Sequence, residues 1–134
     1  MNRPKLLIAD DYASMLERLS TVLRARFEIV GTVTNGNLLI EEVIRTQPDV
    51  VVTDLSMHET NGLEAIRRLK LLRPEIRIVI VTMHADREIV AEALRSGASG
   101  FVLKLVANKD LPTAIDWALE GRVYVTPAIA TVGM

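Results

Sequence analysis

Apolar residues are concentrated in five short runs along the 134-residue chain. Three of these runs consist almost wholly of Val, Ile and Leu, without the alternation of polar and apolar positions that marks a strand exposed on one face. Such continuous runs indicate strands that are covered on both faces, as in a parallel sheet. The predicted strands are Leu6–Ala9, Ile29–Val33, Val50–Val52, Ile76–Val81 and Phe101–Leu103.

Each apolar run is followed by a segment with the spacing of an amphipathic helix, in which apolar residues recur three and four positions apart. The last segment is the clearest, with one face formed by Leu111, Ala114, Ile115, Ala118 and Leu119. Glycine or proline follows four of these segments, at positions where either residue readily ends a helix. These four residues are Pro48, Pro74, Gly97 and Gly121.

The strict alternation of strand and helix predicts an α/β fold of the (βα)5 type. This fold is a doubly wound, five-stranded parallel sheet with right-handed connections and helices on both faces. We expect one domain over residues 1–121, and a tail or the start of a linker over residues 122–134, which lack a complete predicted element.

Two interpretations of Trp117 stay open: it contacts a partner, or it packs against the strand-like segment Val123–Val125.

Composition and charge exclude several classes of function. The net charge is −1 at pH 7 with acids and bases interspersed, so the chain has no broad basic surface for binding nucleic acid. It has no cysteine, which excludes disulfides and thiolate chemistry. The first apolar run is too short for a signal peptide or a membrane span, so we expect a cytoplasmic protein without a membrane segment.

The predicted strands end in polar residues of complementary chemistry. Strand one ends in Asp10 and Asp11, strand three in Asp54, strand four in Thr82 and strand five in Lys104. In doubly wound sheets ligands bind at the carboxyl ends of the strands, so these side chains are expected to meet at one edge. Each has an ordinary explanation alone, such as a helix cap, a turn residue or a surface lysine, but together they point to a site.

Three clustered carboxylates repel one another unless a cation lies among them, and a site made of oxygen ligands suits Mg²⁺. Lys104 and Thr82 would then offer a positive charge and a hydroxyl donor to an anion beside the metal. A metal, a lysine and a hydroxyl around a carboxylate are the groups that phosphoryl transfer requires. A carboxylate can itself be the nucleophile, and the product is then an acyl phosphate.

At these positions the sequence resembles the receiver domain of two-component response regulators, over residues 5 to about 121. The resemblance is carried by the acidic pair, the segment DLSM that begins at Asp54, Gly62 eight residues later, Thr82 and Lys104. Phe101, three residues before the lysine, matches the family's aromatic switch position. The segment GFVLKLVANKDLPTAIDWALEGRVYVTP is similar to the NarL/FixJ branch, also described as LuxR-type.

The resemblance implies a flavodoxin-like sheet with the strand order 2-1-3-4-5. It also implies Mg²⁺-dependent transfer of a phosphoryl group to Asp54 from a phosphohistidine of a sensor histidine kinase. Asp11, Asp54 and the backbone carbonyl of Ser56 would hold Mg²⁺, with Asp10 assisting through water, and Lys104 would pair with a phosphoryl oxygen. The chain would be a signalling module and not an enzyme, catalysing only its own phosphorylation and dephosphorylation.

In this family phosphorylation changes a surface. Thr82 would swing to bond the phosphoryl group, and Phe101 would turn inward into the space that Thr82 leaves. The surface of helix four, strand five and helix five, residues 87–120, would then control an output, expected to be transcription, and could form a homodimer. Members of this branch usually continue into a helix-turn-helix domain, so DNA would be bound only through an output domain beyond this chain.

Two positions depart from the family pattern. His58 stands four residues after Asp54 where most members have proline, and Leu105 stands where many members have proline, although the NarL/FixJ branch commonly lacks the second proline. His58 either faces solvent in a loop or, by titrating near neutral pH, makes metal or phosphate occupancy pH-dependent. His84, two residues after Thr82, would modulate the lifetime of the acyl phosphate.

Other functions fit the sequence less well. A small phosphatase with an aspartate nucleophile would have Asp-x-Asp after the first strand, but Asp10 and Asp11 are adjacent. A degenerate receiver that binds partners without phosphorylation is suggested by His58 alone and is opposed by the retention of every charged site residue. A dinucleotide-binding domain is excluded because the turn ADDYASM has no glycine for a pyrophosphate to approach.

Overall fold

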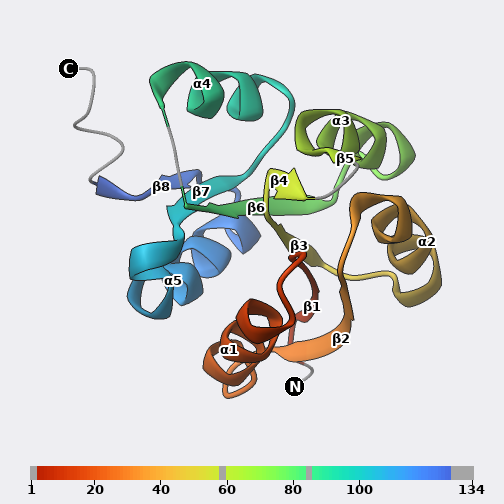
Figure 1. Ribbon diagram of the computed structural model, residues 1–134, viewed down its shortest axis with the longest axis vertical. Helices are drawn as coiled ribbons and strands as arrows, with labels where there is room; N and C mark the ends of the chain where they lie inside the picture. Colours follow the sequence, from red (N-terminus) through yellow and green to blue (C-terminus); the bar gives the residue numbers. More distant parts are fainter. Residues whose placement is uncertain (1–2, 58–59, 84–85, 128–134) are drawn as a thin grey trace.

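The computed structural model describes residues 3–57, 60–83 and 86–127. Its main sheet has six strands, all paired in parallel, in the order β2-β1-β3-β6-β7-β8 (Figure 1). A short antiparallel pair, β4 and β5, lies apart from the main sheet. The strands are β1 Lys5–Ala9, β2 Glu28–Val33, β3 Val50–Thr53, β4 Ser56–Met57, β5 Thr60–Asn61, β6 Arg77–Thr82, β7 Gly100–Leu103 and β8 Tyr124–Val125.

Helices cover both faces of the main sheet. Helices α1 and α5 lie on one face, and α2, α3 and α4 lie on the other (Figure 1). None of the helices described is both long and apolar enough to cross a membrane. Their bounds are α1 Ala13–Leu23, α2 Gly36–Thr46, α3 Gly62–Leu72, α4 Arg87–Arg95 and α5 Ala107–Leu119, with a 3-10 helix, η1, over Lys104–Val106.

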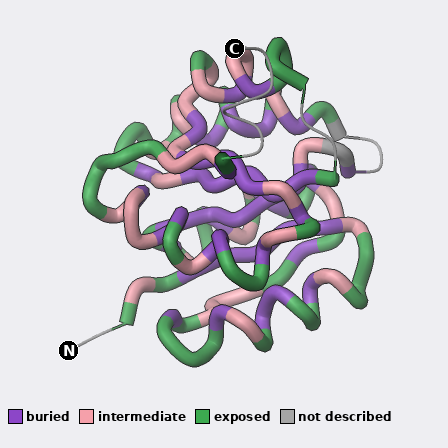
Figure 2. Tube along the Cα trace, turned by 90° about the vertical axis from the view of Figure 1, so that its left-hand side faces the viewer, coloured by how far each residue is buried: buried purple, intermediate pink, exposed green. Residues whose placement is uncertain are grey.

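The apolar runs are continuous because the sheet separates two hydrophobic cores. Along β3, Val50 and Val52 pack into the core beneath α1 and α5, whereas Val51 packs into the core beneath α2, α3 and α4. Successive side chains of a strand point to opposite faces, so a strand between two cores needs apolar residues at every position. Figure 2 shows the buried stretches running through the sheet, with exposed positions on the outer sides of the helices.

The structure confirms the predicted fold class and adds one strand to it. Strands β2-β1-β3-β6-β7 reproduce the predicted order 2-1-3-4-5, and β8 extends the sheet beyond β7. The sequence marked Val123–Val125 as strand-like but not as a complete element, and β8 is only two residues long. Trp117 meets the ring of Tyr124 edge-on at 5.2 Å between centroids, which supports packing against the segment after α5. The boundary between a domain and a tail at residue 121 stays a prediction.

Gly62 begins α3 where the chain returns past the end of β3. A Cβ atom at this position would lie 2.4 Å from the backbone carbonyl oxygen of Leu55. The obstacle is backbone, which cannot rotate away as a side chain can, so only glycine fits. The close approach holds the residues just after Asp54 against the first turn of α3, and Asn61 caps that turn by accepting hydrogen bonds from the amides of Leu63 and Glu64.

Gly62→Ala is therefore expected to lower the free energy of unfolding by about 3 kcal/mol, the upper part of the usual range for overpacking. Gly121→Ala is the matched control, because Gly121 has open space around it and only its φ of +80° disfavours alanine. That conformation costs about 1 kcal/mol. Urea unfolding followed by circular dichroism measures both losses, and equal losses would show that the Leu55 carbonyl does not restrict this position.

Candidate functional site

Two of the predicted site residues lie one position beyond the ends of neighbouring central strands. Asp10 follows β1 and donates its amide to the carbonyl of Val33, 3.1 Å away, and Asp54 follows β3 and donates its amide to the carbonyl of Ala9, 3.2 Å away. These hydrogen bonds extend the parallel ladder past the strand ends, so the backbone at both aspartates is fixed. Both residues are buried.

Lys104 links these two carboxylates from a third strand. It is the first residue of η1, directly after β7, and it is buried with 4% of its surface exposed. Its Nζ lies 2.8 Å from Asp10 Oδ2 and 2.7 Å from Asp54 Oδ2. Burial alone lowers the pKa of Lys104, but the hydrogen bonds and charges of Asp10 and Asp54 outweigh it and raise the pKa. The ammonium is therefore protonated at neutral pH.

Asp11 completes a group of three carboxylates. One oxygen from each of Asp10, Asp11 and Asp54 lies within 4.8 Å of the others. Asp11 is not the cap of α1, because the N-cap residue is Tyr12, which makes no side-chain cap hydrogen bond. With Lys104, the group has two more negative charges than positive ones. An oxygen-only ligand set with this excess of negative charge fits a divalent cation of the Mg²⁺ type.

Tyr12 also belongs to the site, although it was not predicted. Its amide donates to Asp10 Oδ1 at 2.9 Å, so each oxygen of Asp10 has a partner. Its ring centroid lies 6.0 Å from Lys104 Nζ, the outer limit of a cation–π contact, and the side chain is largely exposed. The position next to the acidic pair was the only sequence signal for Tyr12.

The predicted switch residues lie beside this group. Thr82 ends β6, is buried, and pairs in register with Leu103, the residue before Lys104. Phe101 is fully buried in the core beneath α2, α3 and α4, so the ring already occupies an inward position. A rotation of Phe101 between two positions stays a prediction.

Four other positions from the sequence analysis lie near these residues in the chain. Ser56 lies in β4, two residues after Asp54, and the role of its carbonyl as a metal ligand stays a prediction. His58 and His84 lie outside the residues that the structure describes. Leu105, where many family members have proline, follows Lys104 and is almost fully exposed.

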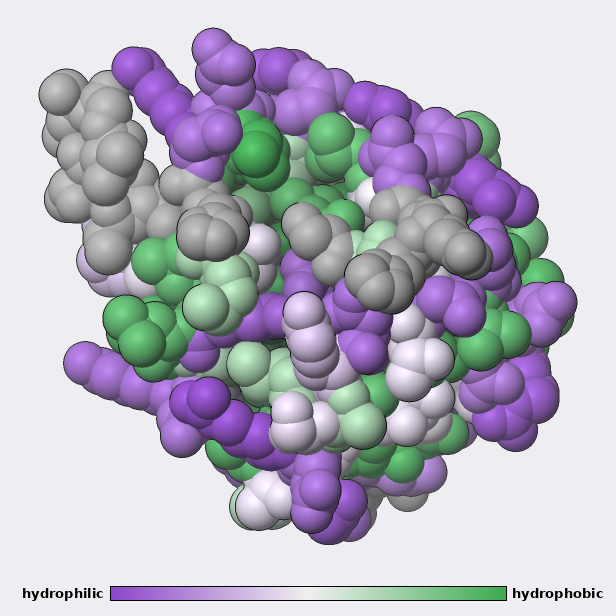
Figure 3. Space-filling view, in the orientation of Figure 1, coloured by the Kyte–Doolittle hydropathy of each residue, from purple (hydrophilic) through white to green (hydrophobic). Residues whose placement is uncertain are grey.

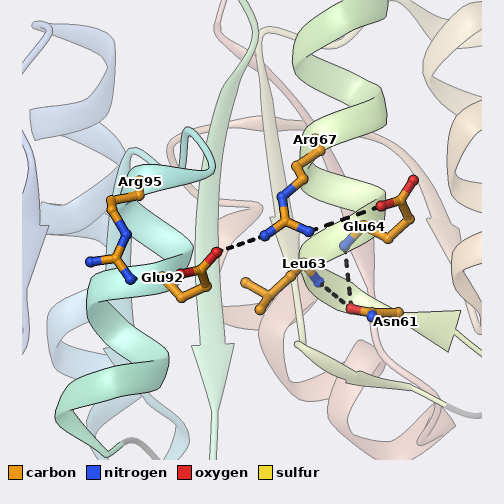
Figure 4. A network of polar contacts seen from close by, with 6 residues as sticks. All are labelled: Asn61, Leu63, Glu64, Arg67, Glu92 and Arg95. Atoms are coloured by element: carbon orange, nitrogen blue, oxygen red, sulfur yellow. Dashed lines mark hydrogen bonds and ion pairs between the residues drawn. The ribbon is translucent and has the colours of Figure 1, made fainter.

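A shallow groove between α3 and α4 is separate from the aspartate group. Figure 3 shows apolar side chains gathered there with hydrophilic ones around them, and Leu63 and Ile89 are among the lining residues. Glu92 of α4 pairs with Arg67 of α3 at 2.7 Å and with Arg95 of its own helix at 2.6 Å (Figure 4). The side chains of these ion pairs are exposed to solvent, so the pairs contribute little to the stability of the fold.

The buried position of Lys104 leads to a stability prediction. Lys104→Met removes the only cation that contacts Asp10 and Asp54 in the described part of the chain, and the remaining carboxylates repel one another. We expect the free energy of unfolding to fall by about 3 kcal/mol, the lower end for breaking a buried pair. Arg67→Met, which breaks an exposed pair with Glu92, is the control and should cost much less. Similar losses in urea unfolding at pH 7 would contradict the buried pair.

Comparison with known proteins agrees with this geometry. Residues 6–116 match the family model described as response regulator receiver domain. The transcriptional regulatory protein DegU of Brevibacillus brevis is 30% identical over 130 residues, which cover 96% of this chain and 55% of that protein. The oxygen regulatory protein NreC of Staphylococcus carnosus (strain TM300) is 34% identical over 130 residues, covering 95% of this chain and 60% of that protein.

A solved structure supports the fold and the branch. The crystal structure of a LuxR-family two-component response regulator from Aurantimonas sp. SI85-9A1 has a TM-score of 0.91 and 29% sequence identity, and the match covers 96% of this chain and 94% of that one. The chain spans little more than half the length of the relatives DegU and NreC. The flavodoxin-like fold, the group of acidic residues and the family match agree with one another. The chain belongs to the response regulator receiver domain family, and within it is similar to the NarL/FixJ branch.

Proposed function

We propose that this receiver domain accepts a phosphoryl group on Asp54 from a phosphohistidine of a sensor histidine kinase. The observation that carries the proposal is the buried Lys104 ammonium, 2.7 Å from Asp54 Oδ2 and 2.8 Å from Asp10 Oδ2. One carboxylate is enough to balance the Lys104 ammonium, but three carboxylates, those of Asp10, Asp11 and Asp54, are grouped here. Receiver domains are signalling modules, and the only reactions proposed for this one are its own phosphorylation and dephosphorylation.

The proposed transfer uses the carboxylate of Asp54 as the nucleophile. One of its oxygens bonds to phosphorus, the P–N bond of the phosphohistidine breaks, and the electron pair of that bond returns to the ring nitrogen of the kinase. Lys104 moves its hydrogen bond from the Asp54 carboxylate to an oxygen of the new phosphoryl group. The hydroxyl of Thr82, at the end of β6, donates a hydrogen bond to another phosphoryl oxygen. This movement of Thr82 links phosphorylation to a change at α4.

The residues that would hold Mg²⁺ are Asp10, Asp11, Asp54 and the backbone carbonyl of Ser56. The oxygen-only ligands and the excess negative charge of the group favour this ion over softer metals. Bound there, Mg²⁺ would neutralise charge on the phosphoryl oxygens. The protein's own contribution is to hold the carboxylates at fixed strand ends, because the amides of Asp10 and Asp54 extend the sheet ladder.

The output is proposed to be read at α4, β7 and α5, which correspond to helix four, strand five and helix five of the prediction. Strand β8 covers the edge of β7, so a homodimer through this surface would include β8 as well. The chain matches little more than half of DegU, a transcriptional regulatory protein, and this supports control of transcription in a longer protein. DNA would then be bound by an output domain, and the cytoplasm is the compartment in which we expect the protein to act.

Incubation of the 134-residue chain with acetyl phosphate tests the central proposal. With Mg²⁺, intact mass spectrometry should show one phosphoryl adduct on the wild type and none on Asp54→Ala, because the nucleophile is lost. An excess of chelator should abolish the adduct on the wild type. Asp49→Asn, which changes an aspartate near the opposite ends of the strands, is the matched control and should be phosphorylated like the wild type.

An adduct of the same yield on Asp54→Ala would place the reaction at another residue and contradict the proposal. The absence of any adduct on the folded wild type would favour the alternative, a degenerate receiver that binds partners without phosphorylation. Unfolding measurements on each variant separate loss of the fold from loss of the reaction.

A further inference from the structure

The segment after α5 packs against the strand that leads to the site lysine. Strand β8 pairs in parallel with β7, with Tyr124 opposite Gly100 and Val125 opposite Phe101 (Figure 1). A Cβ atom at Gly100 would lie 3.3 Å from the carbonyl oxygen of Tyr124, so the two strands approach closely. Residues 122–127 lie beyond the stretch matched by the family model, which ends at residue 116.

Thr126 makes two hydrogen bonds to β7. Its amide donates to the carbonyl of Phe101 at 2.9 Å, and its Oγ1 accepts from the amide of Leu103 at 3.2 Å. Thr126 is buried, with 3% of its surface exposed. A threonine that is buried on one strand and bonded to two backbone groups of another fixes the separation and the register of the two strands.

The hydroxyl of Thr126 replaces a backbone group. In a parallel ladder a residue donates its amide to one residue of the neighbouring strand and accepts, through its carbonyl, from the amide two positions further on. Thr126 donates to Phe101 in this pattern, but its side chain accepts from Leu103. Strand β8 has already ended at Val125, and Pro127 follows. The hydroxyl therefore completes the ladder at the last residue of β7.

A second set of contacts holds β8 in place independently of Thr126. The guanidinium of Arg122 lies 3.9 Å from the centroid of the Trp117 ring, and the Tyr124 ring meets Trp117 edge-on. The carboxylate of Asp110 in α5 lies near the Tyr124 hydroxyl, and the pKa of Tyr124 is raised, first by burial and then by this carboxylate. These contacts attach β8 to α5, whereas Thr126 attaches it to β7.

Leu103 is the residue before Lys104, whose ammonium reaches Asp10 and Asp54. The direction in which the lysine leaves the sheet depends on the backbone at Leu103, and the outer edge of β7 is fixed there by the Thr126 hydroxyl. We propose that Thr126 is a positioning residue for phosphoryl transfer: its hydroxyl holds the end of β7 so that Lys104 meets Asp54. The inference rests on the proposed function, and it places a determinant of the reaction beyond the residues that the family model covers.

The full chain and three variants test the inference. Thr126→Val removes the hydroxyl and keeps the branched shape, Thr126→Ser keeps the hydroxyl, and Tyr124→Phe removes a hydroxyl of β8 that faces α5. Initial rates of adduct formation are measured against acetyl phosphate concentration with Mg²⁺ in excess. We expect Thr126→Val to lower the maximal rate about fivefold, the scale of one neutral hydrogen bond, with little change in the half-saturating concentration. Thr126→Ser and Tyr124→Phe should stay within about twofold of the wild type on the same scale.

A second readout needs no phosphodonor. In Thr126→Val the amide of Leu103 should exchange with solvent at least about tenfold faster, because its acceptor is lost. The ¹⁵N resonance of Lys104 Nζ should also move in this variant, and it should stay in place in Tyr124→Phe. These measurements separate failure of the inference from failure of the proposed function. If the wild type forms no adduct, the proposed function is contradicted and the role in transfer falls with it, but the Nζ resonance still tests whether Thr126 holds Lys104 in place.

Three results would overturn the inference. The first is a wild-type maximal rate in Thr126→Val, and the second is an equal loss of rate in Tyr124→Phe, which would indicate a general effect of β8. The third is an unmoved Lys104 Nζ resonance in Thr126→Val, whether or not the wild type can be phosphorylated.

Discussion

The ammonium of Lys104, shared between Asp10 and Asp54, is the interaction on which the candidate site depends. It joins the ends of β1, β3 and β7 through contacts of 2.8 and 2.7 Å. Burying any one of these charges without a partner would be costly, so the three strand ends constrain one another. The group of three carboxylates around one ammonium suits a divalent cation.

The sheet makes this arrangement possible. A parallel sheet brings the carboxyl ends of all its strands to one edge, and a doubly wound sheet buries both of its faces. Polar chemistry is therefore concentrated where the strands end, as Thr82 and Lys104 illustrate on β6 and β7. Gly62 lets the chain after Asp54 pass close to the start of α3, which keeps that edge compact.

The sequence predicted the parts of the structure that follow from local pattern. Runs of Val, Ile and Leu identified the central strands, because a strand between two cores has no exposed face. The polar residues at or just beyond the ends of those runs identified Asp10, Asp54 and Lys104 as neighbours at one edge of the sheet. Strand β8 was not predicted as a complete element, because two residues carry no periodicity and its contacts, with Trp117 and with β7, are tertiary. The contacts of Tyr12 depend on tertiary structure in the same way, and no spacing rule indicates them.

The most direct test of phosphorylation at Asp54 is to locate the phosphoryl group on the chain. The chain is phosphorylated with acetyl phosphate and Mg²⁺, the acyl phosphate is reduced with borohydride, and the altered residue is identified by peptide mass spectrometry. The account predicts reduction at Asp54 alone. Reduction at Asp10 or Asp11, or at none of the three, would contradict it.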